Sequence, residues 1–209
     1  MFWDILDPPR LSLLKELAFD PPVGRSYLAG GTALAIILGH RESVDFDWFT
    51  PETFDPGVLS RRMEQFGEVK VAETGPGTFI GWIDNTQVTW LCYPNPVLEP
   101  FLEFPDLPGL RIASLTDIGI MKWAALANRG SIKDFLDLYF LDREGLSLKE
   151  LFPLLEKKYP GARINTYHMI KSLSWFDDAE TEPWPVMRKP VEWEEIKERF
   201  LEIQRELFS

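Results

Sequence analysis

The longest apolar run of the chain, residues 27–39, is interrupted after three residues by Gly30-Gly31-Thr32. Tyr27-Leu28-Ala29 is typical of a buried strand, and residues 32–38 are typical of an apolar helix that ends near Gly39. The run is too short to span a bilayer, which takes about 20 apolar residues. The sequence therefore predicts a strand, a tight turn and a helix in immediate succession.

A second strand is predicted at residues 44–49, where large apolar residues alternate with acids and Thr50-Pro51 ends the pattern. Asp45 and Asp47 lie two apart, so both side chains are expected on the same face of this strand. The sequence thus predicts a strand that carries a pair of carboxylates on one face.

The rest of the N-terminal half mixes helices and strands. Apolar spacing predicts helices at residues 11–18 and 56–66, and β propensity predicts antiparallel neighbouring strands at residues 68–73, 78–83 and 87–93. A loop rich in proline and glycine is expected at residues 94–109.

The C-terminal half carries helical patterns only. They run from a cap at Ser114 or Thr116 to residue 128, and then over residues 132–143, 148–159, 164–173 and 191–207. We therefore predict an α/β (α+β) protein in which a mixed-sheet core at residues 1–110 precedes a helical domain at residues 111–209.

Acidic residues outnumber basic ones, with 33 Asp plus Glu against 22 Lys plus Arg and a formal net charge of −11. This balance argues against a general DNA-binding or membrane-binding protein. Residues 122–171 are the exception, with nine basic and six acidic residues. An anionic partner is expected to meet that segment at a basic strip made of Lys157, Lys158, Arg163 and Lys171.

Cysteine and histidine are scarce in this chain. A single cysteine, Cys92, excludes an intramolecular disulfide, and only His40 and His168 accompany it as candidate zinc ligands. The N-terminus lacks the basic and apolar regions of a secretory signal. These features predict a cytoplasmic protein with no membrane partner and no Cys/His zinc site.

The carboxylate pair points to metal chemistry. Two neighbouring carboxylates repel each other, and a divalent cation between them removes the repulsion; such oxygen ligands suit Mg²⁺ with a bound phosphate. The helix that opens at Gly30-Gly31-Thr32 presents backbone N–H groups suited to the phosphates of a nucleotide. Taken singly, the acids are also compatible with a solvated strand face, and the glycines with a simple tight turn.

Two stretches of the sequence resemble a known family. The first reads Leu28-Ala29-Gly30-Gly31-Thr32-Ala33-Leu34-Ala35, followed by Gly39-His40-Arg41-x-Ser43-x-Asp45-Phe46-Asp47. The second, about 75 residues on, reads Asp117-Ile118-x-x-Met121-Lys122-Trp123-x-Ala125-Leu126-x-x-Arg129-Gly130-Ser131-x-Lys133-Asp134-Phe135-x-Asp137-Leu138-Tyr139. Together they look like the DNA polymerase β-like nucleotidyltransferases, and within them most like the AbiEii/MenT toxin group.

The resemblance implies a set of site residues. Asp45 and Asp47 would bind Mg²⁺ and the triphosphate, and Lys122 would contact the nucleotide. Asp134 or Asp137 would lie near the reacting centre. The residues implied in nucleotide or phosphate binding are Gly30, Gly31, Thr32, Arg41, Ser43 and Arg129.

The residues themselves leave some of these roles open. Asp134 and Asp137 lie three apart on a predicted helix, so Lys122 and Arg129 could equally pair with them and tie two helices together. Arg41 is either a phosphate contact or a partner that neutralises Asp45 or Asp47.

One departure from the superfamily concerns a third carboxylate, which such sites usually draw from a later strand. Residues 87–93 contain no acid, and Asp84 falls in a predicted turn just before them. Either Asp134 or Asp137 takes the place of that acid as the base, or the reaction has been lost.

Together these features predict a magnesium-dependent nucleotidyltransferase that moves a nucleoside monophosphate from a nucleoside triphosphate to an acceptor. By resemblance, the acceptor is expected to be RNA, such as the end of a tRNA, and the protein to be a toxin with a cognate antitoxin. The alternatives are a protein acceptor, modified on Ser, Thr or Tyr, and a non-catalytic module that binds a nucleotide or a partner.

Overall fold

The computed structural model describes residues 1–209, which divide into two compact units. The first unit consists of residues Met1–Gly39, Ser43–Asn95 and Pro100–Ser114. The second consists of Leu115–Ser209 together with two short segments from the N-terminal half, His40–Glu42 and Pro96–Glu99.

The first unit is built on one mixed sheet of seven strands in the order β3-β4-β5-β2-β1-β7-β6. The strands are β1 (Tyr27–Ala29), β2 (Phe46–Thr50), β3 (Val69–Gly75), β4 (Thr78–Ile83), β5 (Thr86–Cys92), β6 (Leu102–Phe104) and β7 (Leu107–Ile112). As predicted, β3, β4 and β5 are antiparallel neighbours. The mixed sheet followed by helices confirms the predicted fold class.

The register at the centre of the sheet places three residues side by side. β2 runs antiparallel to β1, with Asp47 opposite Ala29, and parallel to β5, with Asp47 opposite Thr89. Trp48 and Trp90, one residue further along, stack with ring centroids 5.6 Å apart and are buried. Because neighbouring residues of a strand point to opposite faces, this stack anchors one face while Asp47 and Thr89 share the other.

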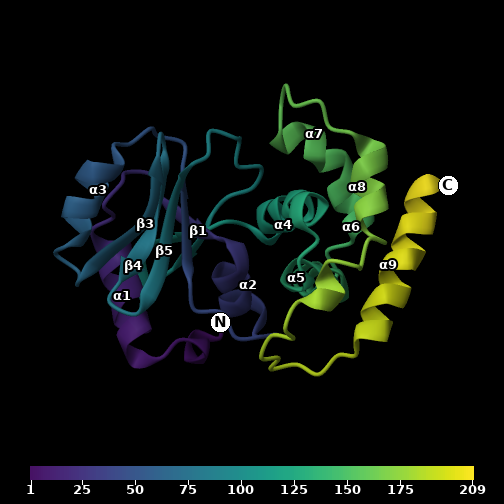
Figure 1. Ribbon diagram of the computed structural model, residues 1–209, viewed down its shortest axis with the longest axis horizontal. Coiled ribbons are helices and arrows are strands. Elements are labelled where there is room, and N and C mark those ends of the chain that lie inside the picture. Colours follow the sequence, from purple (N-terminus) through teal and green to yellow (C-terminus); the bar gives the residue numbers. More distant parts are fainter. The chain divides into compact units, whose positions relative to one another are not determined.

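Three α-helices and a short 3-10 helix, η1 (Trp3–Ile5), accompany the sheet. They are α1 (Pro8–Phe19), α2 (Gly30–Leu38) and α3 (Pro56–Met63), and Figure 1 shows α2 next to β1 and α3 next to β3. Asp7 and Asp55 cap α1 and α3 by accepting backbone N–H groups of the first turn. In contrast, α2 has no side-chain cap, and most of its residues are buried.

Two strand predictions need correction. The expected loop at residues 94–109 contains β6 and the start of β7. Pro108 is tolerated in β7 because β7 pairs with β1 only at Ile112, so Pro108 removes no ladder bond to β1. The expected strand at residues 44–49 begins only at Phe46. Asp45 therefore immediately precedes β2 and is exposed.

The second unit is helical. Its helices are α4 (Leu115–Arg129), α5 (Ile132–Arg143), α6 (Leu148–Leu151), η2 (Phe152–Leu154), α7 (Leu155–Lys158), α8 (Thr166–Ser172), η3 (Ala179–Thr181) and α9 (Trp193–Phe208). The helix expected at residues 148–159 is thus three short pieces, because Pro153 has no N–H to donate to a continuous α-helix. None of the helices is both long enough and apolar enough to cross a bilayer.

Aromatic packing and one short β-bridge organise the second unit. Phe135 of α5 contacts Phe200 of α9 and Phe176, with ring centroids about 5 Å apart. Segment His40–Glu42 joins this unit through a bridge between Arg41 and Met187 and through hydrogen bonds between His40, Glu42 and residues 186–189. Two residues of the first sequence motif, His40 and Arg41, are thereby positioned among the C-terminal helices.

Candidate active site

The turn between β1 and α2 requires glycine at its first position. Gly30 has a φ of +73°, a conformation that residues with a side chain rarely adopt. A Cβ atom at Gly30 would lie 2.5 Å from Oδ2 of Asp47, well inside van der Waals contact. The absence of a side chain therefore brings the start of α2 against the carboxylate of Asp47.

The first turn of α2 is suited to an anion. The N-cap residue of α2 is Ala29, whose side chain cannot accept the backbone N–H groups that every helix leaves without an intrahelical partner at its start. The hydroxyl groups of Thr32 and Ser43 lie 2.8 Å apart and share one hydrogen bond. Thr32 is buried and Ser43 half-buried, so this pair fixes the segment before Asp45 to the first turn of the helix.

The two acids of the first motif differ in setting. Asp47 lies within β2 and is half-buried, whereas Asp45 is exposed just before the strand. On the neighbouring strand, Thr89 is level with Asp47, and Gln87 points to the same face two residues earlier. Sequence reasoning did not single out Thr89 or Gln87; only the parallel pairing of β2 with β5 identifies them.

Asp84 does not lie with this pair. It occupies the turn between β4 and β5 with a φ of +51°, and its Oδ1 accepts the N–H of Glu68 at 2.9 Å. Asp84 precedes β5, whose first residue, Thr86, is already roughly 10 Å from Thr89 along the strand at the usual rise per residue. Asp84 is therefore a turn residue and does not supply the missing third carboxylate.

Asp137 is the centre of a buried ion cluster in the second unit. Its carboxylate accepts hydrogen bonds from Nε and Nη2 of Arg41 at 2.7 and 2.9 Å, and it lies 2.6 Å from Nζ of Lys122. Nε2 of His40 lies 2.8 Å from its Oδ1. Asp137 and His40 are fully buried, and Arg41 is 3% exposed. The partner of Arg41 is thus an acid 96 residues away, which neither sequence alternative named.

Asp134 extends the cluster toward solvent. It accepts hydrogen bonds from Nε and Nη2 of Arg129 at 2.7 and 2.9 Å and from Nζ of Lys122 at 3.0 Å. Lys122 on α4 therefore bridges both acids of α5, as the helix-tying alternative in the sequence expected. We call these six side chains, His40, Arg41, Lys122, Arg129, Asp134 and Asp137, the ion cluster.

The ionisation states within the cluster follow from burial and charge together. Burial by itself would raise the pKa of Asp137, but the charges of Lys122 and Arg41 outweigh it and hold that pKa well below its ordinary value. Burial would lower the pKa of Lys122, yet the carboxylates of Asp137 and Asp134 raise it. Both partners are therefore charged at neutral pH.

His40 behaves differently. Burial lowers the pKa of His40 below its ordinary value, and the hydrogen bond to Asp137 offsets only part of that effect. Because Asp137 is ionised, Nε2 of His40 carries the hydrogen and donates it. Nδ1 is buried without a hydrogen-bond partner, so a proton added there would have no acceptor. His40 is neutral in the folded protein, and sequence reasoning had counted it only as an unused zinc ligand.

A second buried pair corrects the predicted basic strip. Lys158 is fully buried, and its Nζ lies 2.6 Å from Asp117 and 2.9 Å from the carbonyl oxygen of Pro96. Asp117 also accepts the N–H groups of Leu98 and Glu99, which fixes segment Pro96–Glu99 to the second unit. Lys158 is therefore a structural residue and not part of a surface that meets an anionic partner.

Comparison with known proteins identifies relatives over nearly the whole chain. Residues 12–209 match the family model described as the nucleotidyl transferase AbiEii toxin of a type IV toxin–antitoxin system. An uncharacterized protein of Aquifex aeolicus (strain VF5) is 44% identical over 177 residues, which cover 83% of this chain and 84% of that protein.

Two solved structures share the fold. A putative nucleotidyltransferase from H. pylori superposes with a TM-score of 0.59 at 16% identity, over 95% of this chain and 91% of that one. MenT4, a nucleotidyltransferase toxin from Mycobacterium tuberculosis H37Rv, gives a TM-score of 0.56 at 18% identity, over 96% and 83% of the two chains.

Proposed function

The chain belongs to the AbiEii nucleotidyltransferase toxin family and is a nucleotidyltransferase, and we propose that it transfers a nucleoside monophosphate from a nucleoside triphosphate to RNA. In this reaction a hydroxyl oxygen of the acceptor bonds to the α-phosphorus, and the bond from that phosphorus to the bridging oxygen breaks. The acceptor hydroxyl loses its proton, and pyrophosphate leaves.

One observation carries the proposal: Gly30 brings the uncapped start of α2 against the carboxylate of Asp47. Backbone N–H groups at a helix start attract phosphates, whereas a carboxylate repels them. A site that combines the two is suited to a triphosphate that arrives with a cation. The hydroxyl groups of Thr32 and Ser43 lie at the same helix start and can donate hydrogen bonds to phosphate oxygens.

The residues at this turn fit Mg²⁺ as the cation. Asp45 and Asp47 offer the hard oxygen ligands that Mg²⁺ prefers, and one or two carboxylates are what it usually takes from a protein when phosphates supply other ligands. When bound there, Mg²⁺ would neutralise charge that develops on the phosphate oxygens. The side-chain oxygens of Thr89 and Gln87 face the same side of the sheet and could orient the acids or bound water.

The roles proposed for the ion cluster are limited by its own bonding. Lys122 directs two of its three N–H donors to Asp134 and Asp137, so one donor remains for a phosphate oxygen. A carboxylate whose pKa is held far below its ordinary value is a weak proton acceptor, so Asp137 is poorly suited to be the general base. Asp134 is the other acid of the pair, and Arg129 and Lys122 hold its carboxylate.

The acceptor and the partner are part of the proposal. The family is one of toxins in type IV toxin–antitoxin systems, which supports a cognate antitoxin for this chain. RNA is proposed as the acceptor because the basic excess of residues 122–171 stands out in an otherwise acidic chain. Protein acceptors and binding without transfer are outcomes that the following experiment separates.

The test follows the label of each nucleoside triphosphate in turn, labelled at the α-phosphate, with the protein, Mg²⁺ and either total RNA or cell lysate. We expect label in RNA together with release of pyrophosphate, and neither with the Asp47→Asn variant. Label in protein alone would replace the RNA acceptor by a protein acceptor. Mg²⁺-dependent nucleotide binding without pyrophosphate release under any condition would identify a binding module.

A further inference from the structure

A cavity of about 320 Å³ lies in the second unit beside the ion cluster. It is formed by the C-terminal end of α4, by α8 and by the turn that follows α8. Arg129, Lys171, Trp175 and Asp178 are the side chains that decide its chemistry. We call it the α4–α8 pocket.

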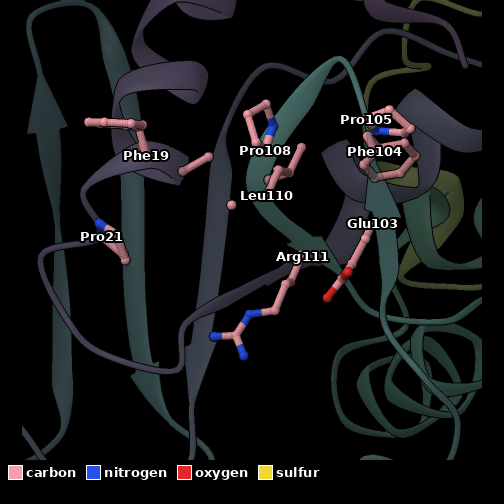
Figure 2. A pocket seen from close by; sticks show the side chains of 10 residues that line it. Phe19, Pro21, Glu103, Phe104, Pro105, Pro108, Leu110 and Arg111 are labelled. Carbon is pink, nitrogen blue, oxygen red and sulfur yellow. The ribbon is translucent and has the colours of Figure 1, made fainter.

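The charge of this pocket sets it apart from two other cavities. Arg129 and Lys171 face a single acid, Asp178, so the lining has a formal surplus of one positive charge in a chain that carries −11 overall. The larger cavity of about 670 Å³ in the first unit has one acid, Glu103, one base, Arg111, and otherwise apolar side chains (Figure 2). A third cavity is lined by three acids and one arginine. Only the α4–α8 pocket favours an anion.

Trp175 gives the pocket an aromatic surface. Its side chain is 58% exposed, although a side chain of this size is usually mostly buried. Its indole N–H donates to Oδ2 of Asp178 at 3.1 Å, which orients the ring and uses one of the carboxylate oxygens. Gly130, with a φ of +60°, also borders Asp178; a Cβ there would lie 3.2 Å from that side chain. The ring is held in place before any ligand arrives.

The cations of the pocket are positioned in different ways. Arg129 is fixed by its two hydrogen bonds to the buried carboxylate of Asp134, while its own side chain is 60% exposed. The ion cluster contains three permanent cations and two carboxylates, and Arg129 is its exposed end. Lys171 lies one turn from the exposed ring of Tyr167 on α8 and reaches solvent. Phosphate oxygens can therefore meet both an ordered and a flexible cation.

We propose that the α4–α8 pocket binds one nucleotide of the single-stranded acceptor strand, with its base stacked on Trp175 and its phosphate facing Lys171 and Arg129. The inference rests on the proposed transfer to RNA, for which it names an acceptor subsite. A cavity of about 300 Å³ is large enough for a small ligand. Aromatic stacking combined with cations along the backbone is how proteins hold single strands without reading their sequence.

The test measures binding of a short fluorescein-labelled single-stranded RNA by anisotropy, without nucleoside triphosphate, so that no turnover is needed. Stacking of one base is worth 1–3 kcal/mol, so Trp175→Ala should weaken binding by roughly 5- to 100-fold. Trp184→Ala, which removes another exposed tryptophan, is the matched control and should change binding less than twofold.

Salt dependence tests the phosphate contact. If Lys171 meets one phosphate, Lys171→Ala should reduce the slope of log affinity against log salt by about 0.7. Lys70→Ala removes an equally exposed charge in the first unit and should leave the slope unchanged. Unchanged affinity in Trp175→Ala together with an unchanged slope in Lys171→Ala would overturn the inference.

Competition by AMP and the measurement of transfer distinguish the acceptor pocket from a mononucleotide site and from the proposed function. If free AMP displaces the RNA as strongly as the unlabelled strand does, the pocket is a mononucleotide site and the acceptor assignment is wrong. RNA binding that depends on Trp175 and Lys171 in the absence of any transfer would leave the pocket standing while the proposed function fails. Transfer to RNA with an unchanged KM for RNA in Trp175→Ala and Lys171→Ala would support the proposed function and overturn the acceptor pocket.

Discussion

The glycine turn of the first unit and the ion cluster of the second use the same kinds of residue in opposite ways. At the turn, Asp47 is half-buried, Asp45 is exposed, and Gly30 leaves room beside the carboxylate of Asp47. In the cluster, both carboxylates are fully buried and each meets at least two positively charged side chains. In the first arrangement the acids stay partly in water, whereas in the second the protein's own cations hold both carboxylates.

This difference distinguishes charged residues that serve the reaction from charged residues that stabilise the fold. A buried charge without a partner costs several kcal/mol, so a change that breaks the cluster lowers the stability of the unit. Acids that remain partly in water carry no such requirement, and the attraction of Asp47 to the start of α2 is worth about 1 kcal/mol or less. We therefore expect substitutions at the turn to act on chemistry and substitutions in the cluster to act first on stability.

The largest effect is expected at the turn. Asp47→Asn preserves the shape of β2 but weakens cation binding, and nucleotide transfer should fall by about a thousandfold or more, since charge stabilisation by a metal is worth several kcal/mol. The melting temperature should change little, because the loss of repulsion from Asp45 opposes the loss of attraction to the start of α2. Asp45→Asn should behave alike, and Asp84→Asn in the β4–β5 turn is the control with normal transfer. Near-normal transfer by either motif variant would show that this strand is not the metal site.

The next largest effect is expected on folding. Asp137→Asn removes the carboxylate that accepts two hydrogen bonds from the buried guanidinium of Arg41, which should lower the free energy of unfolding by about 3–5 kcal/mol, or roughly 10 °C in melting temperature. Urea denaturation measures this loss of unfolding free energy. Glu144→Gln, which removes a carboxylate from the exposed pair with Lys189, should cost less than about 1 kcal/mol. Equal small losses in both variants would mean that the cluster is not what holds α4 and α5 together.

Lys122 belongs to the ion cluster and also has a proposed contact to the nucleotide, so its substitution should affect both stability and transfer. In Lys122→Met, Asp134 keeps Arg129 and Asp137 keeps Arg41, so the loss of stability should be smaller than for Asp137→Asn, about 2 kcal/mol. A phosphate contact adds a loss of transfer of about a hundredfold in protein that is still folded. Transfer that falls only in proportion to the unfolded fraction would leave Lys122 with a structural role alone.

Gly30→Ala should have a similar effect on stability by another route. A non-glycine residue at positive φ costs about 1–3 kcal/mol, and at Gly30 the added methyl group also displaces the carboxylate of Asp47. Gly161→Ala, at a φ of +84° with no atom within 4 Å of the new Cβ, isolates the backbone cost. The additional loss of stability in Gly30→Ala over Gly161→Ala measures the cost of the contact with Asp47. Equal losses in the two variants would show that this contact is not crowded.

Local patterns in the sequence predicted most of the fold. β4 was predicted at the residues where it lies, and α5 likewise, because alternation and helical spacing are properties of neighbouring residues. β6 and β7 were missed because their strand character comes from pairing across the sheet, while their prolines indicate a loop. The division of α6, η2 and α7 follows from Pro153, a signal that was present and not used.

The candidate site was predictable to a different degree in the two regions. Gly30 and Asp47 are close in sequence and lie on adjacent strand ends, so the motif places them together. The pairs of Asp137 with Arg41 and of Lys158 with Asp117 join residues 96 and 41 positions apart, and no local pattern encodes such contacts. Charge type was evident in the sequence, but burial, which decides what a charge does, became visible only in the fold.

The smallest expected effect is a pH dependence of stability from His40. Its pKa is lowered in the folded state, so between pH 6.5, the ordinary value, and the folded pKa the unfolded chain binds more protons than the folded one. The stability contributed by neutral His40 is therefore present above that window and is lost as the pH falls through it. The facing groups, Asp137, Arg41 and Lys122, keep their charges there, because Asp137 has a lowered pKa and Lys122 a raised one.

Melting temperatures measured from pH 7.5 down to pH 5 check this expectation in the wild type and in His40→Gln, whose amide can still donate to Asp137. The wild type should lose stability with a slope of at most about 1.4 kcal/mol per pH unit beyond that of the variant, the limit for one proton. A variant slope equal to that of the wild type would show that His40 is not protonated on unfolding in this range. The contrast between the two regions would then rest on the salt bridges alone.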